Sequence, residues 1–410
     1  MTQLPPLSSC GKGEKRIEPI DVEKARLETP GCAQVVHFNN AGASLPPQAV
    51  TAAMVGYLEL EAQIGGYETE LQCEREIGNT YTALAAMLHC RREEIAYAES
   101  ATRAWDMAFY GIPLRPGDRI LTGRMEYGSN WIAMLQRARQ TGATIEVVPS
   151  DESGQICVES LQNMLDERVK LIALTHVPTN GGLVNPAAEV GRIARQAGVL
   201  YLLDACQSAG QMPLDVEVLG CDFLSATGRK FLRGPRGTGF LYVRESALEK
   251  LEPPFLDMFA AEWITRDSYR LQPDARRFEA FEANYAAKIG LGVAVDYALR
   301  WGLDAIQERV RSLATILRTQ LAALPGVTVH DLGRERCGIV TFTTDGIEPW
   351  DLRIRLAAHR IHIWTSNPGG TRLDMEARNL TRLARASVHY YNTEAEIDRF
   401  CTTLASMRIA

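Results

Sequence analysis

The chain has 410 residues, which is too long for one small domain and fits a large domain joined to a smaller one. Hydrophobic residues make up 46% and charged residues 23%, the mixture of an ordinary globular protein with ample material for a core. The net charge of -6 argues against a nucleic-acid surface spread over the whole protein, and no apolar run is long enough to span a bilayer.

The sequence leads us to expect neither a secretory signal nor a metal site. The run MTQLPPLSSCGKGEKRIEP lacks an apolar segment, so we expect no secretory signal. The 9 cysteines are scattered without CxxC spacing, which indicates neither a disulfide framework nor a zinc site. We therefore expect reduced thiols, a cytoplasmic location, and no metal, membrane or nucleic-acid partner.

The first part of the chain is predicted to be an arm followed by two helices. Residues 1–34 are the N-terminal arm, and VVHFNNAGASLPP (35–47) predicts a short strand and a turn. Pro46 and Pro47 then open a helix that Gly65 and Gly66 end. A second helix is expected from about residue 70 to residue 88.

From there the pattern alternates between short apolar runs and amphipathic helices. Strands are predicted at 119–123, 144–149, 170–176, 199–204, 222–227 and 239–243. Helices at 130–142 and 187–198 lie between some of them. This alternation predicts an α/β large domain over residues 35–290, with a mostly parallel sheet flanked by helices.

The pattern changes after about residue 290. Helices are predicted at 287–302, 303–324, 349–360 and from residue 393, with strands at 327–332, 337–344, 361–364 and 385–391. Strands covered by helices in this order predict a smaller α+β domain over residues 291–410.

Polar residues gather where the predicted strands end. They occur in YAESATR, GRMEYGSN, THVPTNGG, LLDACQ and SATGRK. Because ligands of open α/β sheets bind beyond the carboxyl ends of the strands, these five segments predict a binding site.

Asp204 and Lys230 give this site a chemistry. Asp204 alone is equally well explained as a helix cap or as half of a buried ion pair. However, a strand-end aspartate followed by a strand-end lysine is the pairing that a pyridoxal-phosphate enzyme needs. The lysine forms the Schiff base, and the carboxylate keeps the pyridinium proton so that the ring withdraws electrons.

Two further features fit the same cofactor. Ser100, Ala101 and Thr102 begin a helix, where backbone N–H groups bind phosphate, although an ordinary N-cap looks the same. Tyr127 is suited to lie against a flat ring, and equally suited to a core.

At this point the chain resembles the class V aminotransferase and cysteine desulfurase family, which are fold-type I pyridoxal-phosphate enzymes. The resemblance runs from about Val35 onward. It is carried by FNNAGAS, THVPTNGGLVNP, LLDACQSAGQMPLDV, SATGRKFLRGPRGTGFLYV, RFEAFEANYAAKIGLG and RASVHYYNTEAEID.

The resemblance implies pyridoxal 5'-phosphate as the cofactor, with Lys230 as the Schiff-base lysine and Asp204 at the pyridine nitrogen. Gln207 would bond the ring oxygen, and Tyr127 stands where desulfurases carry a stacking histidine. The other implied cofactor contacts are Ala101, Thr102, Thr227 and Arg229 at the phosphate, and Thr179 near the ring.

The resemblance also implies how the substrate is held. Arg385 matches the arginine that binds the α-carboxylate, a bidentate task for a planar guanidinium. Asn40 and Asn180 are implied on the substrate side. Glu282 and Asn284 lie where the family reaches the neighbouring subunit's phosphate, so a homodimer is expected. Since a carboxylate would repel phosphate, we expect Glu282 to order Arg229 or a substrate amine.

A cysteine desulfurase attacks the substrate sulfur with a cysteine on a loop before this arginine. The corresponding loop here, residues 364–385, contains none. Cys206 next to Asp204 is interpreted as packing, Cys337 begins a strand and Cys401 lies in the last helix. We therefore favour a C–S lyase that eliminates the substituent of an S-substituted cysteine or its sulfoxide, leaving pyruvate and ammonia.

The run ELEAQIGGYE resembles the ergothioneine-pathway sulfoxide lyases, and the chain is also similar to cystine lyases. Glu61, Tyr67 and Trp263 would shape a pocket for a bulky S-substituent, or are ordinary packing. Aminotransferase and epimerase activities, the latter with Tyr127 as second acid/base, and decarboxylation-coupled variants stay open. A desulfurase or a non-catalytic scaffold is less expected.

Overall fold

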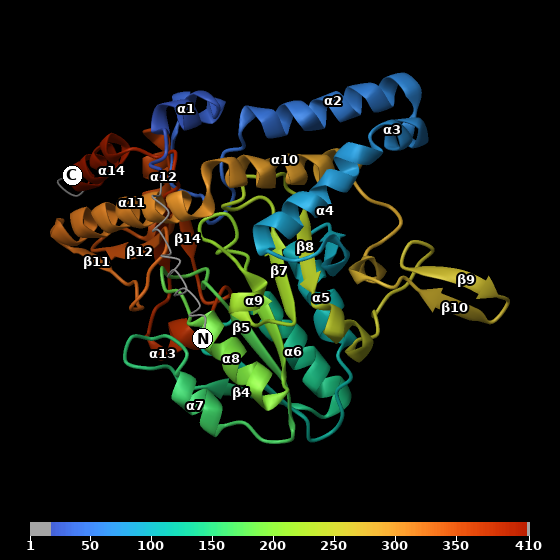
Figure 1. Cartoon of the computed structure of the whole chain (residues 1–410). Coiled ribbons are helices and arrows are strands. Elements are labelled where there is room, and N and C mark those ends of the chain that lie inside the picture. Colours follow the sequence, from blue (N-terminus) through green and yellow to red (C-terminus); the bar gives the residue numbers. More distant parts are fainter. Residues whose placement is uncertain (1–17, 408–410) are drawn as a thin grey trace, which may run out of the picture.

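The computed structural model describes residues 18–407 (Figure 1). Residues 1–17, half of the predicted N-terminal arm, lie outside the described residues. The described part begins with two short helical segments, α1 (Val22–Leu27) and η1 (Pro30–Ala33), followed by the long helix α2 (Gln48–Ile64). None of the helices between residues 18 and 407 is long and apolar enough to cross a membrane.

The central element is a seven-stranded sheet. Its strands in spatial order are β2 (Ile95–Ala98), β8 (Gly239–Val243), β7 (Phe223–Thr227), β6 (Leu200–Asp204), β5 (Val169–Thr175), β3 (Arg119–Gly123) and β4 (Thr144–Val148). Only β8 runs against its neighbours. The six predicted strands match β3 to β8 within one residue at each end, and the predicted α/β class is confirmed.

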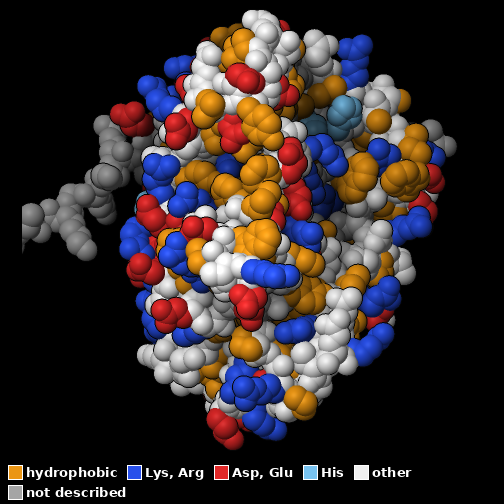
Figure 2. Space-filling model, turned by 90° about the vertical axis from the view of Figure 1, so that its right-hand side faces the viewer, with side chains coloured by type: hydrophobic (Ala, Val, Ile, Leu, Met, Phe, Trp, Pro, Cys, Tyr) orange, Lys and Arg blue, Asp and Glu red, His pale blue; other side chains and the backbone are white. Residues whose placement is uncertain are grey.

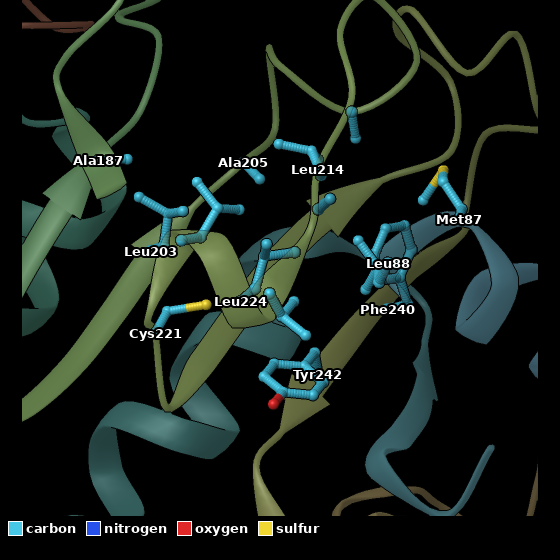
Figure 3. Packing of buried hydrophobic residues seen from close by; sticks show 14 of the residues in the cluster. Met87, Leu88, Ala187, Leu203, Ala205, Leu214, Cys221, Leu224, Phe240 and Tyr242 are labelled. Carbon is cyan, nitrogen blue, oxygen red and sulfur yellow. The ribbon is translucent and has the colours of Figure 1, made fainter. Parts of the chain in front are cut away.

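Helices cover both faces of this sheet. On one face, Leu203, Leu224 and Phe240 belong to one core cluster with residues of α4 (Glu74–Leu88), α8 (Ala187–Ala197) and α10 (Tyr285–Trp301), and Phe240 lies beside Leu88 of α4 (Figure 3). The strand residues that alternate with these, such as Leu202, point to the opposite face and pack against α5 (Ala101–Gly111) and α6 (Gly128–Thr141). Burial on both faces explains why these strands read as continuous apolar runs in the sequence.

The C-terminal part has its own sheet and core. Four antiparallel strands lie in the order β11 (Val327–Val329), β12 (Ile339–Thr344), β15 (Leu383–Ser387) and β14 (Trp364–Ser366). They pack with α11 (Leu303–Ala323), α12 (Pro349–Ala358) and α14 (Glu394–Ser406) around residues such as Phe342 and Phe400.

The segment predicted to open the large domain joins this C-terminal part. Strand β1 (Val36–His37) pairs with β13 (Ile361–His362), and Phe38 belongs to the same core as Phe342. The polypeptide therefore crosses from one part to the other just before α2, and the domain limits at residues 34 and 290 stay a prediction.

Two regions differ from the sequence-based expectation. The single helix expected at 70–88 is two helices, α3 (Gly66–Gln72) and α4, which meet at Cys73. The hairpin of β9 (Ala261–Thr265) and β10 (Ser268–Leu271) was not predicted, and it projects from the body of the molecule (Figure 1). Most of its side chains are exposed, so its sequence lacks the apolar alternation that marks a half-buried strand.

Short helices α7 (Val158–Asn163), α9 (Val216–Leu219) and α13 (Arg372–Ala377) complete the described elements with η2 (Arg92–Glu94), η3 (Glu245–Lys250) and η4 (Ala275–Phe278).

Candidate active site

Two adjoining cavities lie where the strands of the large sheet end. The inner cavity, of about 90 Å³, is lined by the start of α5 and by the ends of β5, β6 and β7. The outer cavity, of about 380 Å³, is lined by Asn39, residues 41–43, residues 364–367 and Arg385, among others. Tyr127, Thr179, Arg229 and Lys230 line both. The topology thus brings the five predicted strand ends together, as expected for an open α/β sheet.

Lys230 lies at the junction of the two cavities. It lies three residues after the end of β7, and only 9% of the residue is exposed. Burial lowers the pKa of its ammonium group, and Arg229 and Arg385 act in the same direction, against Cys206 and Asp204. A lowered pKa increases the fraction of neutral amine, which is the form that attacks a carbonyl carbon.

Asp204 ends β6 at the floor of the inner cavity. Its Oδ1 accepts a hydrogen bond of 2.9 Å from the Cys206 amide, and its Oδ2 accepts one of 2.9 Å from Asn130 Nδ2. Burial raises the pKa of the Cys206 thiol, and the Asp204 charge raises it further. Cys206 is therefore held as a neutral thiol.

The start of α5 forms the end of the inner cavity that suits a phosphate. Ser100 caps this helix through a bond of 3.2 Å from the Arg103 amide, and the N–H groups of Ala101 and Thr102 are in its first turn. Strand β8 approaches closely here because residue 239 is glycine. A Cβ at Gly239 would lie 2.6 Å from the Ser100 carbonyl carbon.

Two other predicted phosphate contacts, Thr227 and Arg229, also line the inner cavity. The Thr227 hydroxyl donates to the Thr238 carbonyl over 3.2 Å, and Arg229 donates through Nη1 to the Gly42 carbonyl. Burial lowers the pKa of Arg229. Helix N–H groups together with a cation are a suitable environment for a dianionic phosphate.

Gln207 shows that the inner cavity is built for a polar ligand. Its Nε2 donates to the Ala41 carbonyl over 3.1 Å and to Thr179 Oγ1 over 3.3 Å. Its Oε1 is enclosed and has no hydrogen-bond partner. Because buried polar atoms are normally paired, a bound molecule with polar groups completes this site. The residues therefore fit pyridoxal 5'-phosphate.

Arg385 presents a second unpaired group on the outer cavity. Its Nη1 donates to the carbonyl and hydroxyl of Thr179, over 3.0 and 2.8 Å. Its Nε is enclosed without a partner. Burial lowers the pKa of its guanidinium to about 10, and Arg229 acts in the same direction. One edge of a fixed guanidinium is thus left to bind a carboxylate.

Two asparagines predicted on the substrate side are placed differently. Asn40 is fully buried, and its Nδ2 donates to the Ser387 carbonyl over 2.7 Å, so it ties the N-terminal segment to β15. Its neighbours Asn39 and Ala41 line the outer cavity in its stead. Asn180 lines the outer cavity, but its Nδ2 donates hydrogen bonds of 3.0 Å to the Asn367 carbonyl and to Thr371 Oγ1, which lie in the loop between β14 and α13.

The residues predicted to shape a pocket or to reach a neighbour lie elsewhere. Glu61, Tyr67, Glu282 and Asn284 line a separate cavity of about 660 Å³ between α2, α3 and the start of α10. Trp263 is on the projecting hairpin, with 77% of it exposed. None of these five residues lines the inner or the outer cavity of its own chain.

The structure adds residues that sequence reasoning missed. Glu126 and Asn130 stand in the quoted segment GRMEYGSN, and both are buried beside Asp204. Arg236 and Trp364 line the outer cavity. Asn130 lies in the first turn of α6, whereas Glu126 precedes the N-cap Tyr127, so no helical spacing in the sequence signals their contact.

Comparison with known proteins agrees with this geometry. The family model for Aminotransferase class-V matches residues 35–400. A probable cysteine desulfurase of Methanothermobacter thermautotrophicus is 30% identical over 400 residues, covering 93% of this chain and 97% of the relative.

Solved structures also match nearly the whole chain. The apo cysteine desulfurase of Thermococcus onnurineus has a TM-score of 0.87 at 27% identity, covering 94% of this chain and 97% of that one. A cystine C–S lyase in complex with its reaction product cysteine persulfide has a TM-score of 0.83 at 24% identity, covering 92% and 99%, and shows the shared fold. The chain belongs to the class V aminotransferase family, and its cofactor is pyridoxal 5'-phosphate.

Proposed function

We propose that this protein is a carbon–sulfur lyase that acts on an S-substituted L-cysteine or its sulfoxide. The products are pyruvate, ammonia and a sulfur-containing fragment. The observation that carries the proposal is the combination of Lys230, Asp204 and Arg385 around cavities that offer no reactive thiol. Among the described residues, Cys206 is the only cysteine that lines either cavity, and burial raises the pKa of its thiol.

Each residue has a role in this reaction. Pyridoxal 5'-phosphate, when bound, withdraws electrons from the Cα of an amino acid. Lys230 would hold the cofactor, and its amine would accept the Cα proton. Asp204 would hold the proton of the ring nitrogen, Tyr127 would cover one face of the ring, and Arg385 would orient the substrate through its α-carboxylate.

The bond changes balance without an enzyme thiol. The Cα–H bond breaks and its proton goes to Lys230 Nζ, and the Cβ–S bond breaks with its electron pair leaving on sulfur. The remaining three-carbon fragment takes up water and gives pyruvate and ammonia. A thiolate or a sulfenate is a good leaving group for this step, which favours cysteine conjugates as substrates.

Cysteine desulfurase activity is the second candidate, because relatives across the whole chain carry that name. That reaction needs a thiolate that reaches the substrate sulfur and yields alanine. Cys206 has a raised thiol pKa, and the loop at residues 364–385 has no cysteine. These two features support elimination over desulfuration.

A pyruvate screen tests the proposal. The holoenzyme is incubated with L-cystine, S-methyl-L-cysteine and its sulfoxide, and pyruvate is measured with lactate dehydrogenase. We expect pyruvate from at least one conjugate, and none from Lys230→Ala. Pyridoxamine phosphate formed without pyruvate would instead indicate an aminotransferase.

We also infer that two copies form the active unit. Large apolar side chains are exposed on α2, α3 and the hairpin, among them Leu58, Leu71 and Trp263 at 52%, 76% and 77%. Figure 2, which shows the side of the molecule that carries the hairpin, has apolar side chains gathered between charged ones. Exposed apolar patches of this kind mark protein interfaces.

Glu282 and Asn284 belong to this same region of the molecule, since they line a cavity with Tyr67 of α3. This location supports the prediction that they serve a neighbouring subunit. Analytical ultracentrifugation of wild type and Leu71→Lys tests it. A dimer that dissociates in the variant is expected, whereas a monomeric and fully active wild type would remove the role of Glu282.

A further inference from the structure

The proposed reaction leaves one buried acid without a role. Glu126 follows β3, lies behind the inner cavity and is 4% exposed. Its Oε1 accepts three hydrogen bonds: 2.6 Å from Thr175 Oγ1, 2.8 Å from Asn130 Nδ2 and 2.9 Å from the Tyr127 amide. Its Oε2 accepts a fourth, of 2.9 Å, from Thr122 Oγ1. The carboxyl group is therefore held on all sides.

Asn130 connects this acid to Asp204. The residue is 2% exposed, and its single side-chain nitrogen lies 2.8 Å from Glu126 Oε1 and 2.9 Å from Asp204 Oδ2. A side-chain amide has two N–H groups, so both are used to bridge two carboxyl groups. Nothing about a stable core requires this arrangement, because two buried acids so close to each other are costly.

The bridge determines how Asp204 faces the cavity. Asn130 bonds Oδ2 from one side and the Cys206 amide bonds Oδ1 from the other. A carboxylate offers about four acceptor sites, and these two bonds use one on each Asp204 oxygen, so both oxygens keep the capacity to accept a further hydrogen bond. With both oxygens tied to the protein, the carboxylate does not rotate, and these free positions keep a fixed direction.

We propose that Glu126 and Asn130 are positioning residues that orient the Asp204 carboxylate toward the nitrogen of the cofactor ring, which rests on the proposed function in which Asp204 holds that proton. Glu126 anchors the Asn130 amide, and Asn130 fixes Asp204. Loss of the bridge frees the carboxylate to turn away, so the ring nitrogen holds its proton less firmly.

The test reads the ring nitrogen directly. Apoprotein is loaded with pyridoxal 5'-phosphate labelled with ¹⁵N in the ring, and the ¹⁵N chemical shift is measured at one pH near neutrality. We expect wild type at the position of a protonated pyridine and Asn130→Leu displaced toward the unprotonated position. The loss of one or two hydrogen bonds also predicts cofactor loss on dialysis that is about 5- to 30-fold faster.

Three further variants separate orientation from folding. Glu126→Gln keeps an oxygen that accepts from Asn130, so its ¹⁵N shift should stay at the wild-type position. Thr122→Val removes only the bond to Glu126 Oε2 and should also match wild type. If Asn130→Leu does not fold, Asn130→Ser replaces it, and a ¹⁵N shift between those of wild type and an unprotonated ring is expected.

Two failures are distinguishable. An Asn130→Leu shift equal to that of wild type, while Asp204→Ala is displaced, would overturn the positioning role and leave the role of Asp204 intact. A wild-type ring nitrogen that is unprotonated, or that Asp204→Ala does not change, would instead contradict the proposed role of Asp204 itself.

Discussion

Replacing Arg385 by lysine tests how the substrate is held. The variant keeps a positive charge but loses the planar fork. In the structure Nη1 is already engaged by two bonds to Thr179, and Nε is enclosed without a partner. A lysine has one nitrogen, which cannot both bond Thr179 and present two parallel N–H groups to a carboxylate.

The expected loss follows from the bonds that disappear. A hydrogen bond to a charged group contributes about 1.5–3 kcal/mol. If one such bond to the substrate carboxylate is lost, affinity should fall about 10- to 150-fold. Thr179→Val removes the hydroxyl that accepts from Arg385 Nη1 and from Gln207 Nε2 but keeps the carbonyl bond to Arg385, so it should weaken binding less than Arg385→Lys does.

The assay compares two amines that differ in the carboxylate. Binding of L-alanine and of ethylamine to the holoenzyme is followed through the visible absorption of the cofactor. Arg385→Lys should weaken L-alanine and leave ethylamine nearly unchanged. Undiminished affinity for L-alanine, or equal losses for both amines, would refute the assignment of Arg385 to the α-carboxylate.

The remaining predictions concern the cofactor and acid stability. Lys230→Ala should lose the absorption above about 400 nm that the wild-type holoenzyme shows, and a wild type that is colourless after loading would contradict the role of Lys230. Gly239→Ala should bind the cofactor more weakly in equilibrium dialysis, because its Cβ would displace the start of α5, whereas Gly56→Ala, with open space around it, should bind normally. Burial lowers the pKa of His176 to about 4, against about 6.5 in an unfolded chain, so below about pH 6.5 only the unfolded state takes up this proton. As the pH is lowered from about 6.5 to about 4, the unfolding free energy of wild type, compared with that of His176→Gln in urea titrations, should therefore fall by about 1.4 kcal/mol per pH unit. A difference between the two proteins that does not depend on pH would contradict this effect of burial.

The sheet could be predicted from the sequence because its strands are enclosed. The runs at 119–123 and 239–243 coincide with β3 and β8, since burial on both faces demands consecutive apolar residues. The break between α3 and α4 at Cys73 was not predicted, because no glycine or proline interrupts the helical pattern there. The hairpin was not predicted because most of its side chains are exposed, so its sequence shows no alternation of apolar and polar residues.

The site was predictable where topology alone gathers residues. Asp204, Lys230 and Thr227 meet because parallel strands end at one edge of the sheet. The sequence could not show which of Asn39 and Asn40 lines the cavity, because a shift of one residue along the chain moves a side chain from the cavity to the core. The contact between Asn130 and Asp204 depends on the rotation of α6 against β6, which short-range patterns do not report.

The balance between pyruvate and alanine tests the central claim most directly. Wild type and Cys206→Ser holoenzymes are supplied with L-cysteine and with S-methyl-L-cysteine sulfoxide, and both three-carbon products are quantified together. A lyase without an enzyme thiol should give pyruvate from the sulfoxide, at rates that the substitution changes less than about 5-fold, the effect of a lost weak contact. Alanine as the main product from L-cysteine, abolished in Cys206→Ser, would contradict this and identify a desulfurase.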